Sequence, residues 1–156
     1  MTSSPGSSRR LVAVLGPTAG GKSALALLLA RRLGCEIINC DSRQIYRGMD
    51  IGTAKPTPNE RREIPHHLFD LVEPTQEYSA GAYSRAARRC IEDLWRLGRR
   101  PLVVGGTGFY FQALMDGVPS APADTGLRER ILERLHDEGL QVLVDELRRL
   151  DPVGAA

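Results

Sequence analysis

The chain has 156 residues, which is enough for one domain with a hydrophobic core, and 42% of them are hydrophobic. Its formal net charge of +2 is too small to indicate a nucleic-acid-binding protein by itself. No stretch is long and apolar enough to span a bilayer or to form a signal-peptide core, so we expect a cytoplasmic protein. The three cysteines form no CxxC pair, and we expect reduced thiols.

Strands and helices are predicted to alternate from the first apolar run onward. Residues Leu11–Leu15 (LVAVL) form a continuous apolar run that is typical of a buried parallel strand. The leucines of Lys22–Leu33 recur at helical spacing, and Gly34 is suited to end that helix. The next apolar run, Cys35–Cys40 (CEIINC), predicts a second strand that leads directly into Asp41.

The middle of the chain is less regular. Gly48–Glu63 combines glycine, proline and mixed charges, so we expect a loop there, followed by a short strand over His67–Leu71. Three elements are predicted after these: a helix over Ala80–Leu97, a buried strand over Pro101–Val104 and a short helix over Phe109–Met115. The regular alternation predicts a parallel α/β sheet flanked by helices.

The composition changes after Gly117. The segment Val118–Ala123 is rich in proline and alanine and is interpreted as a linker. Apolar stripes that end at Gly139 and at Asp151 then predict two helices joined as an αα-hairpin. We therefore divide the chain into a flexible tail (1–10), an α/β core with an incomplete sheet (11–117) and the truncated start of a helical domain (118–156).

The turn after the first predicted strand carries a phosphate-binding motif. GPTAGGKS fits the pattern G-x-x-x-x-G-K-[ST] and lies between a predicted strand and a predicted helix, as in P-loop nucleotide-binding proteins. The candidate phosphate-binding residues are Gly16, Pro17, Thr18, Ala19, Gly20, Gly21, Lys22 and Ser23. Backbone N–H groups would hold the phosphate, Lys22 would neutralise it, and Ser23 could ligate Mg²⁺. The expected fold is therefore P-loop NTPase-like.

Asp41 is the candidate acidic residue of the predicted cleft. Ligands of open α/β sheets bind at the carboxyl ends of strands, so Asp41 is expected to face the P-loop as a base or a metal ligand. The alternative is a turn aspartate that caps the next segment. The strand over Pro101–Val104 ends in Gly105-Gly106-Thr107 without an acid, which argues against an ATP-hydrolysing protein that holds Mg²⁺ there.

Four stretches together resemble the bacterial tRNA dimethylallyltransferases, also called tRNA isopentenyltransferases or the IPP transferase family. They are GPTAGGKS (Gly16–Ser23), DSRQIYRGMDIGTAKP (Asp41–Pro56), HHLFDLVEP (His66–Pro74) and PLVVGGTGFY (Pro101–Tyr110). The first is general to P-loop proteins, whereas the second is specific to this family. The resemblance implies transfer of a dimethylallyl group from its diphosphate to N6 of the adenine next to the tRNA anticodon. The P-loop would then hold the diphosphate.

The resemblance also implies roles for individual residues. Asp41 matches the family's general base on adenine N6, and Thr107 matches a threonine that contacts the diphosphate and the nucleotide. Lys22 and Ser23 match contacts to the diphosphate and to Mg²⁺. The residues that match tRNA contacts are Asp41, Ser42, Arg43, Gln44, Thr107 and, in a weaker alignment, Arg128.

Members of the family are longer than this chain, and their second half supplies an arginine-bearing motif, further tRNA contacts and the remaining strands. Residues 118–156 would therefore begin an inserted tRNA-binding helical domain. We expect a monomer with Mg²⁺ as cofactor, the tRNA anticodon stem-loop and dimethylallyl diphosphate as partners, and no membrane contact. The alternatives are a P-loop small-molecule kinase and an inactive tRNA-binding remnant. Tyr46 and Tyr110 are interpreted as core residues, with stacking on a flipped base as the alternative.

Overall fold

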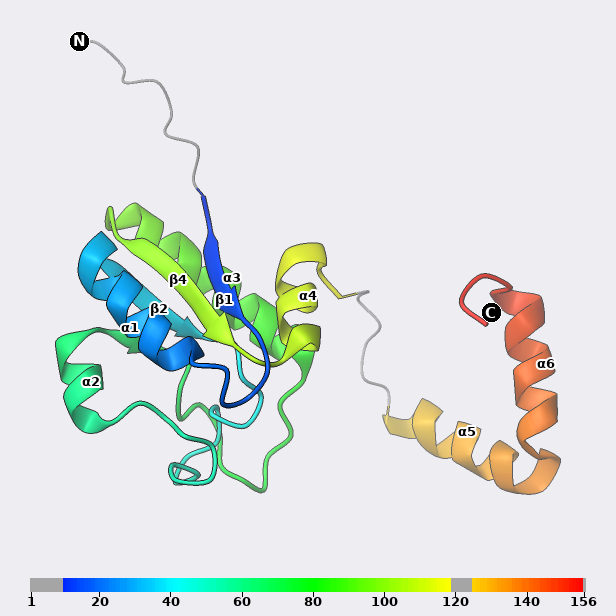
Figure 1. Cartoon of the computed structure of the whole chain (residues 1–156). Coiled ribbons are helices and arrows are strands. Elements are labelled where there is room, and N and C mark those ends of the chain that lie inside the picture. Colours follow the sequence, from blue (N-terminus) through cyan, green and yellow to red (C-terminus); the bar gives the residue numbers. More distant parts are fainter. Residues whose placement is uncertain (1–9, 119–124, 156) are drawn as a thin grey trace, which may run out of the picture. The chain divides into compact units, whose positions relative to one another are not determined.

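The computed structural model describes residues 10–118 and 125–155, and the chain divides into two compact units, Met1–Val118 and Pro119–Ala156. The first unit contains a sheet with flanking helices, and the second contains two helices (Figure 1). The expected flexible tail (1–10) and the expected linker (118–123) lie almost entirely outside the described residues.

Four parallel strands form the sheet of the first unit, in the order β1-β4-β2-β3. They are β1 (Val12–Leu15), β2 (Cys35–Asn39), β3 (His66–His67) and β4 (Arg100–Gly105). Three of them correspond to the apolar runs LVAVL, CEIINC and PLVV, so the predicted parallel α/β fold is confirmed. The predicted strand over His67–Leu71 exists only as β3, which ends at His67; its extension to Leu71 is wrong, because Leu68 and Asp70 have φ angles of 63° and 55°, which interrupt an extended backbone.

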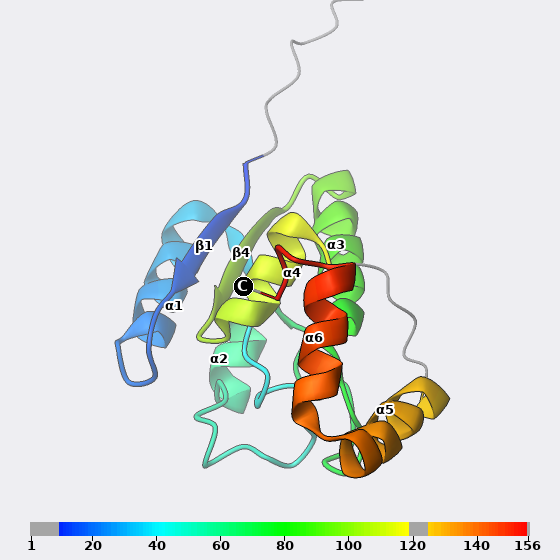
Figure 2. The same ribbon diagram turned by 90° about the vertical axis from the view of Figure 1, so that its right-hand side faces the viewer.

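Adjacent residues of the central strands pack into two separate cores. The longer helices around the sheet are α1 (Lys22–Leu33), α3 (Ala80–Arg96) and α4 (Gly108–Asp116). Ile37 and Leu102 pack with α1, whereas Ile38 and Val103 pack with α3 and α4. Figure 2 shows α1 on one side of the sheet and α3 and α4 on the other. Both faces of the central strands are therefore covered, as continuous apolar runs predict.

A short helix, α2 (Pro58–Glu63), lies in the segment that the sequence predicts to be a loop. The Thr57 hydroxyl accepts a hydrogen bond from the Glu60 N–H over 3.3 Å, and the Glu60 carboxylate accepts one from the Thr57 N–H over 2.7 Å. This capping box satisfies N–H groups at the start of the helix. The prediction of a loop is wrong for these residues because α2 buries none of its side chains, so no apolar periodicity reveals it.

The second unit is a hairpin of two helices, α5 (Thr125–Glu138) and α6 (Leu140–Leu150) (Figure 2). The chain turns at Gly139, whose φ of 85° suits glycine. Arg134 of α5 forms an ion pair with Glu146 of α6 over 2.7 Å. The predicted αα-hairpin is therefore confirmed. None of the described helices has the length and apolar character needed to cross a membrane.

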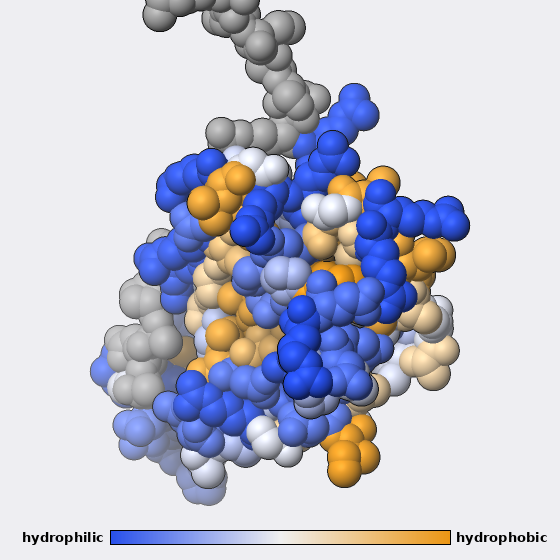
Figure 3. Space-filling model, turned by 90° about the vertical axis from the view of Figure 1, so that its left-hand side faces the viewer, coloured by the Kyte–Doolittle hydropathy of each residue, from blue (hydrophilic) through white to orange (hydrophobic). Residues whose placement is uncertain are grey.

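The outer strand β1 and the neighbouring helix α1 expose part of their apolar side chains. Val12 and Leu15 of β1 are 45% and 43% exposed, and Leu25 and Leu28 of α1 are 47% and 44% exposed. Figure 3 faces the α1 side of this unit and shows hydrophobic surface between hydrophilic side chains. The prediction of a buried strand at Leu11–Leu15 is therefore wrong for β1, because it is an edge strand among the described strands and is covered less than β2 and β4.

Candidate active site

The loop between β1 and α1 exposes its backbone to solvent. Residues Pro17 to Gly21 are exposed, and Gly21, with a φ of 75°, is the N-cap of α1. No described side chain caps this helix, and its first turn carries no acidic residue. The backbone N–H groups and the positive end of the helix dipole are therefore available to an anion such as phosphate.

Lys22 and Ser23 follow this loop in the first turn of α1. The Lys22 ammonium lies over the loop, because it donates a hydrogen bond to the Pro17 carbonyl over 2.6 Å. Ser23 is exposed and lines a neighbouring cavity. The motif thus has the strand–loop–helix setting in which a P-loop holds phosphate.

Asp41 directly follows β2 and is oriented by its own loop. Its N–H donates to Asn39 Oδ1 over 3.0 Å, and its Oδ1 accepts from the Arg43 N–H over 2.9 Å. The buried Asn39 amide in turn donates to the carbonyls of Asp41 and Leu68. Within the described parts of the chain, Asp41 Oδ2 receives no hydrogen bond, so it is the oxygen available to a ligand.

Asp41 and Lys22 border the same space, which is open because Gly106 has no side chain. A Cβ atom on Gly106 would lie 3.9 Å from Asp41 Oδ2, 3.8 Å from Lys22 Nζ and 3.2 Å from the Gly16 carbonyl oxygen. The carboxylate after β2 and the lysine of the P-loop therefore flank one small space. Sequence analysis does not single out Gly106, although it belongs to the GGTG stretch.

Thr107 joins the loop after β4 to the loop of Asp41. Its hydroxyl accepts a hydrogen bond from the Ser42 N–H over 2.9 Å and donates one to the Ser42 hydroxyl over 3.2 Å. Its own N–H donates to the Cys40 carbonyl over 3.2 Å. Thr107 is the N-cap residue of α4, yet its hydroxyl makes no capping bond to that helix. The side chain therefore holds two loops together.

The backbones at the ends of β2 and β4 touch at Gly105. A Cβ atom there would lie 1.9 Å from the Cys40 carbonyl oxygen, far inside van der Waals contact. The Cys40 N–H donates to the Val104 carbonyl over 2.7 Å. A side chain at position 105 would force one strand to move, so glycine is required where the two strands approach the site.

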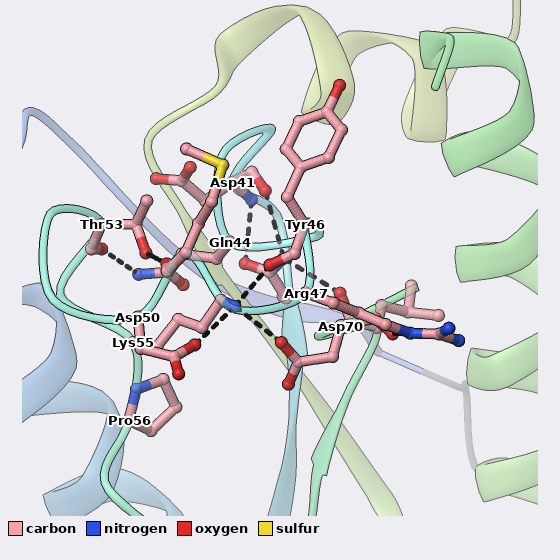
Figure 4. A network of polar contacts seen from close by, with 12 residues as sticks. Asp41, Gln44, Tyr46, Arg47, Asp50, Thr53, Lys55, Pro56 and Asp70 are labelled. Carbon is pink, nitrogen blue, oxygen red and sulfur yellow. Dashed lines mark hydrogen bonds and ion pairs between the residues drawn. The ribbon is translucent and has the colours of Figure 1, made fainter. Parts of the chain in front are cut away.

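Lys55 anchors the loop that follows Asp41 (Figure 4). Its side chain is 2% exposed, and its ammonium donates to Asp50 over 2.8 Å, to Asp70 over 2.6 Å and to the Tyr46 carbonyl over 2.5 Å. Burial lowers the pKa of Lys55, but the hydrogen bonds to the two carboxylates outweigh it, and the pKa is raised. The local sequence around Lys55 does not indicate this role, and its one distinguishing feature is that Lys55 is one of two lysines in the chain.

The residues expected to touch tRNA differ in their surroundings. The Gln44 amide donates to the carbonyls of Thr53 over 2.8 Å and Ala54 over 3.2 Å, so its nitrogen is used inside the protein. Arg43 has an exposed side chain beside Asp41. Arg128 is also exposed, but it lies on α5 in the second unit.

A cavity of about 280 Å³ adjoins the P-loop on the face of the sheet that α1 covers. Its polar lining residues are Ser23, Gln44, Lys55, Glu60 and His66. Its apolar lining residues are Ala26, Leu27, Ile37, Ala54, Pro56, Phe69 and Val104. Such a cavity is suited to a small apolar group that is attached to a phosphate held at Ser23.

The described residues offer few ligands for a metal ion. Between them, residues 10–118 and 125–155 contain no group of three or more His, Cys, Asp or Glu side chains that could hold one. His66 Nδ1 bonds to the Ile64 carbonyl over 2.6 Å, and His67 Nε2 bonds to Glu36 over 2.7 Å, so both histidines have structural contacts. A Mg²⁺ ion would therefore depend on the Ser23 hydroxyl and on oxygens of a bound phosphate, which are ligands that suit it.

Two family models match the sequence. The model for IPP transferase matches residues 44–156, and the model for isopentenyl transferase matches residues 9–69. The chain belongs to the IPP transferase family. The two matches overlap from Gln44 to Phe69, a segment that contains Lys55 and the loop after Asp41.

Curated relatives of the family are similar along nearly the whole chain. The tRNA dimethylallyltransferase of Geobacter metallireducens is 51% identical over 148 residues, which are 94% of this chain and 48% of the relative. That of Geobacter sulfurreducens is 46% identical over 157 residues, which are 100% of this chain and 50% of the relative. The chain thus spans about half the length of these relatives. Both are named tRNA dimethylallyltransferases, and neither name supports the small-molecule kinase alternative.

Solved structures of the family share the fold. A tRNA isopentenylpyrophosphate transferase of Bacillus halodurans is 40% identical, with a TM-score of 0.69 over 94% of this chain and 49% of that one. A eukaryotic dimethylallyltransferase acting on tRNA is 35% identical, with a TM-score of 0.78 over 94% of this chain and 37% of that one. The P-loop NTPase-like α/β fold is therefore confirmed.

Proposed function

We propose that this chain is part of an enzyme that transfers a dimethylallyl group from dimethylallyl diphosphate to N6 of the adenine next to the anticodon of tRNA. One observation carries the proposal: Asp41 Oδ2 and Lys22 Nζ flank the same space at Gly106. A base beside a diphosphate-binding cation suits a displacement in which an amine attacks a carbon bound to diphosphate. The names of the relatives describe the same class of reaction.

The diphosphate would lie on the backbone N–H groups of Gly16–Ser23, at the N-terminus of α1. The Lys22 ammonium, now bonded to the Pro17 carbonyl, is close enough to the loop to turn toward diphosphate oxygens. Negative charge grows on these oxygens as the C–O bond breaks, and the N–H groups and Lys22 stabilise it. A Mg²⁺ ion held by the Ser23 hydroxyl and the diphosphate would add positive charge at the leaving group.

Asp41 would accept the proton of the adenine amine. N6 forms a bond to the allylic carbon while the C–O bond to diphosphate breaks, and N6 then loses a proton to Asp41 Oδ2. The Arg43 N–H occupies Oδ1, which leaves Oδ2 for this role. Thr107 acts as a positioning residue, because its hydroxyl holds Ser42, the neighbour of Asp41. The adenine must leave its stack to reach the carboxylate.

The RNA partner in this proposal is the anticodon stem-loop of tRNA. Arg43 in the first unit and Arg128 in the second are exposed and could contact RNA phosphates. Residues 118–156 would be the start of an inserted tRNA-binding helical domain, in an enzyme that is a cytoplasmic monomer.

The test is prenyl transfer itself. The chain, alone and mixed with the second half of the Geobacter metallireducens relative, is incubated with labelled dimethylallyl diphosphate, Mg²⁺ and tRNA. We expect label on adenine N6 in the complete mixture, and loss of that label with Asp41→Asn. Phosphate transfer from ATP to a small molecule, without label in the RNA, would contradict the proposal.

A further inference from the structure

The loop that follows Asp41 exposes apolar side chains at its tip. Ile51 is 98% exposed, and its neighbour Met49 is 40% exposed. The described residues of the chain therefore cover these two side chains less than they cover the apolar side chains of the core. Large apolar side chains that gather in contact with water mark interaction surfaces. The tip therefore offers apolar surface to a partner.

This loop is fastened from within. Lys55 pairs with Asp50 over 2.8 Å, and the Lys55 N–H also donates to the Asp50 carbonyl over 3.1 Å. The Ala54 N–H donates to the Ile51 carbonyl over 3.1 Å, and the Gln44 amide holds the Ala54 carbonyl. Ile51 is thus presented by a loop of defined shape, so little conformational freedom is lost when a partner binds.

An apolar hollow lies beside this tip, with a volume of about 510 Å³. Its lining includes the side chains of Arg43, Tyr46, Met49 and Ile51, together with Gly48, Asp50, Gly52 and Thr53. The Tyr46 ring is half-buried, because one part of it packs against the core beside α3 and α4, as expected of a core residue. Figure 4 shows the ring directed away from the Lys55 ammonium, so it is not part of the ion-pair network. An aromatic ring, a guanidinium plane and aliphatic side chains around one space are the groups that pack on nucleobases.

The charges around the apolar hollow suit an RNA backbone. Arg43 is exposed, and its guanidinium forms no ion pair with the residues that the structure describes. Asp50, the acid that lines the apolar hollow, is neutralised by its ion pair with Lys55. The surface therefore attracts phosphate groups more than it repels them.

The apolar hollow also begins beside the candidate base. The Arg43 N–H donates to Asp41 Oδ1 over 2.9 Å, so one short segment carries both the carboxylate and a wall of the apolar hollow. When an adenine leaves its stack to reach Asp41, the bases next to it lose a stacking partner. A site that receives one of these bases would replace the lost contact.

We propose that the apolar hollow binds the nucleobase next to the modified adenine in the unpaired loop of the RNA. Ile51 and Met49 contact the edge of this base, and Tyr46 or Arg43 stacks on its face. The inference rests on the proposed function and adds a base-binding site that is separate from the P-loop and from the carboxylate of Asp41.

Fluorescence anisotropy with a labelled hairpin RNA, whose unpaired loop contains adenine, measures Kd for the chain and for Ile51→Ser. We expect roughly tenfold weaker binding by Ile51→Ser, because a base contact is lost. The thermal midpoint should not change, since the side chain is exposed. Leu97→Ser is the matched control: Leu97 is 71% exposed and lies between α3 and β4, at the opposite end of the sheet. This variant should bind the RNA normally.

A double-mutant cycle identifies the base. The nucleotides on either side of the adenine are replaced one at a time by abasic nucleotides. One of these changes should weaken binding to the unchanged chain but have little further effect on Ile51→Ser, because both changes remove the same contact. The same abasic change should remain fully effective with Leu97→Ser.

Several results would overturn the proposal. Normal binding by Ile51→Ser, or additive effects in the cycle, would show that the apolar hollow takes no base, and the proposed function would stand. An equal loss of affinity for a fully paired duplex would indicate contact with the RNA backbone instead. If the unchanged chain binds no hairpin RNA, this site and the RNA partner of the proposed function both fail, and stabilisation by diphosphate decides separately on the P-loop.

Discussion

The Thr107 hydroxyl accepts a hydrogen bond from the Ser42 N–H over 2.9 Å, although the two residues are 65 positions apart in the sequence. Ser42 follows Asp41, whereas Thr107 follows the glycine that separates Asp41 from Lys22. One hydroxyl therefore couples the loop of the candidate base to the loop that faces the P-loop. A substitution of Thr107 should therefore alter the position of Asp41 although the two side chains form no hydrogen bond with each other.

Thr107→Val keeps the shape of the side chain and removes the hydroxyl. We expect the free energy of unfolding to fall by about 1–2 kcal/mol, because the Ser42 N–H then lacks its partner. Urea denaturation measures this change. Thr107→Ser keeps the hydroxyl and is the control, which should lose less. Equal stability of Thr107→Val and the unchanged chain would mean that the bond contributes nothing.

Asp41→Asn separates proton transfer from structure. Asparagine keeps an oxygen that can accept from the Arg43 N–H, so the loop and the affinity for tRNA should be retained. It cannot accept the adenine proton, and we expect kcat to fall by about 10²–10⁴-fold in an active full-length form of the enzyme. Single-turnover prenyl transfer measures the loss. Near-normal turnover would mean that Asp41 only stabilises the turn with Arg43 and is not the base.

The P-loop should prefer a diphosphate to ATP. We expect pyrophosphate or dimethylallyl diphosphate with Mg²⁺ to raise the thermal midpoint more than ATP does, because no acid follows β4 to hold the Mg²⁺ of ATP. At about 100 times Kd the ligand adds about 2.7 kcal/mol to the free energy of unfolding. A thermal-shift series measures this. A midpoint that only ATP raises would favour a kinase.

Lys22→Ala is the companion variant of that series. Among the described residues the Lys22 side chain makes one hydrogen bond, to the Pro17 carbonyl, so its loss should leave the fold intact. Most of the stabilisation by diphosphate should disappear, because the ammonium is the cation of the loop. A variant that is already unfolded without ligand at room temperature would show that Lys22 is structural.

Asp70 should make stability depend on pH in the acid range. It accepts from Lys55 and Arg61 over 2.6 Å each. Burial raises the pKa of Asp70, but these hydrogen bonds outweigh it, and the pKa lies below its ordinary value of about 3.9. As pH falls, the unfolded chain is protonated at Asp70 first. The stabilisation is therefore complete above the ordinary pKa and is lost as pH falls through the folded-state pKa.

We accordingly expect the free energy of unfolding to decline below about pH 4, and the decline to be smaller in Asp70→Asn. Denaturant unfolding between about pH 3 and pH 6 measures both slopes. Asp116→Asn is a suitable control, because its carboxylate has no ion pair with the described residues. Identical slopes for Asp70→Asn and the unchanged chain would contradict the assignment.

The order of elements and the position of Asp41 could be predicted from local sequence. The strands LVAVL, CEIINC and PLVV are continuous apolar runs, which are typical of parallel strands, although of these three only β2 and β4 are buried on both faces. Parallel strands end at the same edge, so an acid after the second run had to lie near the P-loop. The strand order β1-β4-β2-β3 could not be predicted, because three equally apolar runs do not indicate which two are neighbours.

The roles of Lys55 and Gly106 depend on contacts between residues that are distant in the sequence, so they could not be predicted from it. Lys55 meets Asp70 across 15 positions, and nothing local to either residue indicates that they are paired. The pattern Thr57-x-x-Glu60 does indicate a helix start, but without an apolar run after it the segment resembles a loop. Gly106 matters only because β4 lies beside β1. This pairing places Gly106 between Asp41 and Lys22, where it leaves space that a side chain would fill.

The contact of bare backbone at Gly105 sets how closely the ends of β2 and β4 approach each other. The Cys40 carbonyl and the Gly105 Cα meet with no room for a methyl group, so main-chain atoms determine how closely the end of β4 approaches the residue before Asp41. Substitutions in the two cores, such as Ile38→Val, can loosen the protein without resetting this distance. The close approach of the ends of β2 and β4 should therefore persist through such changes as long as position 105 keeps its glycine.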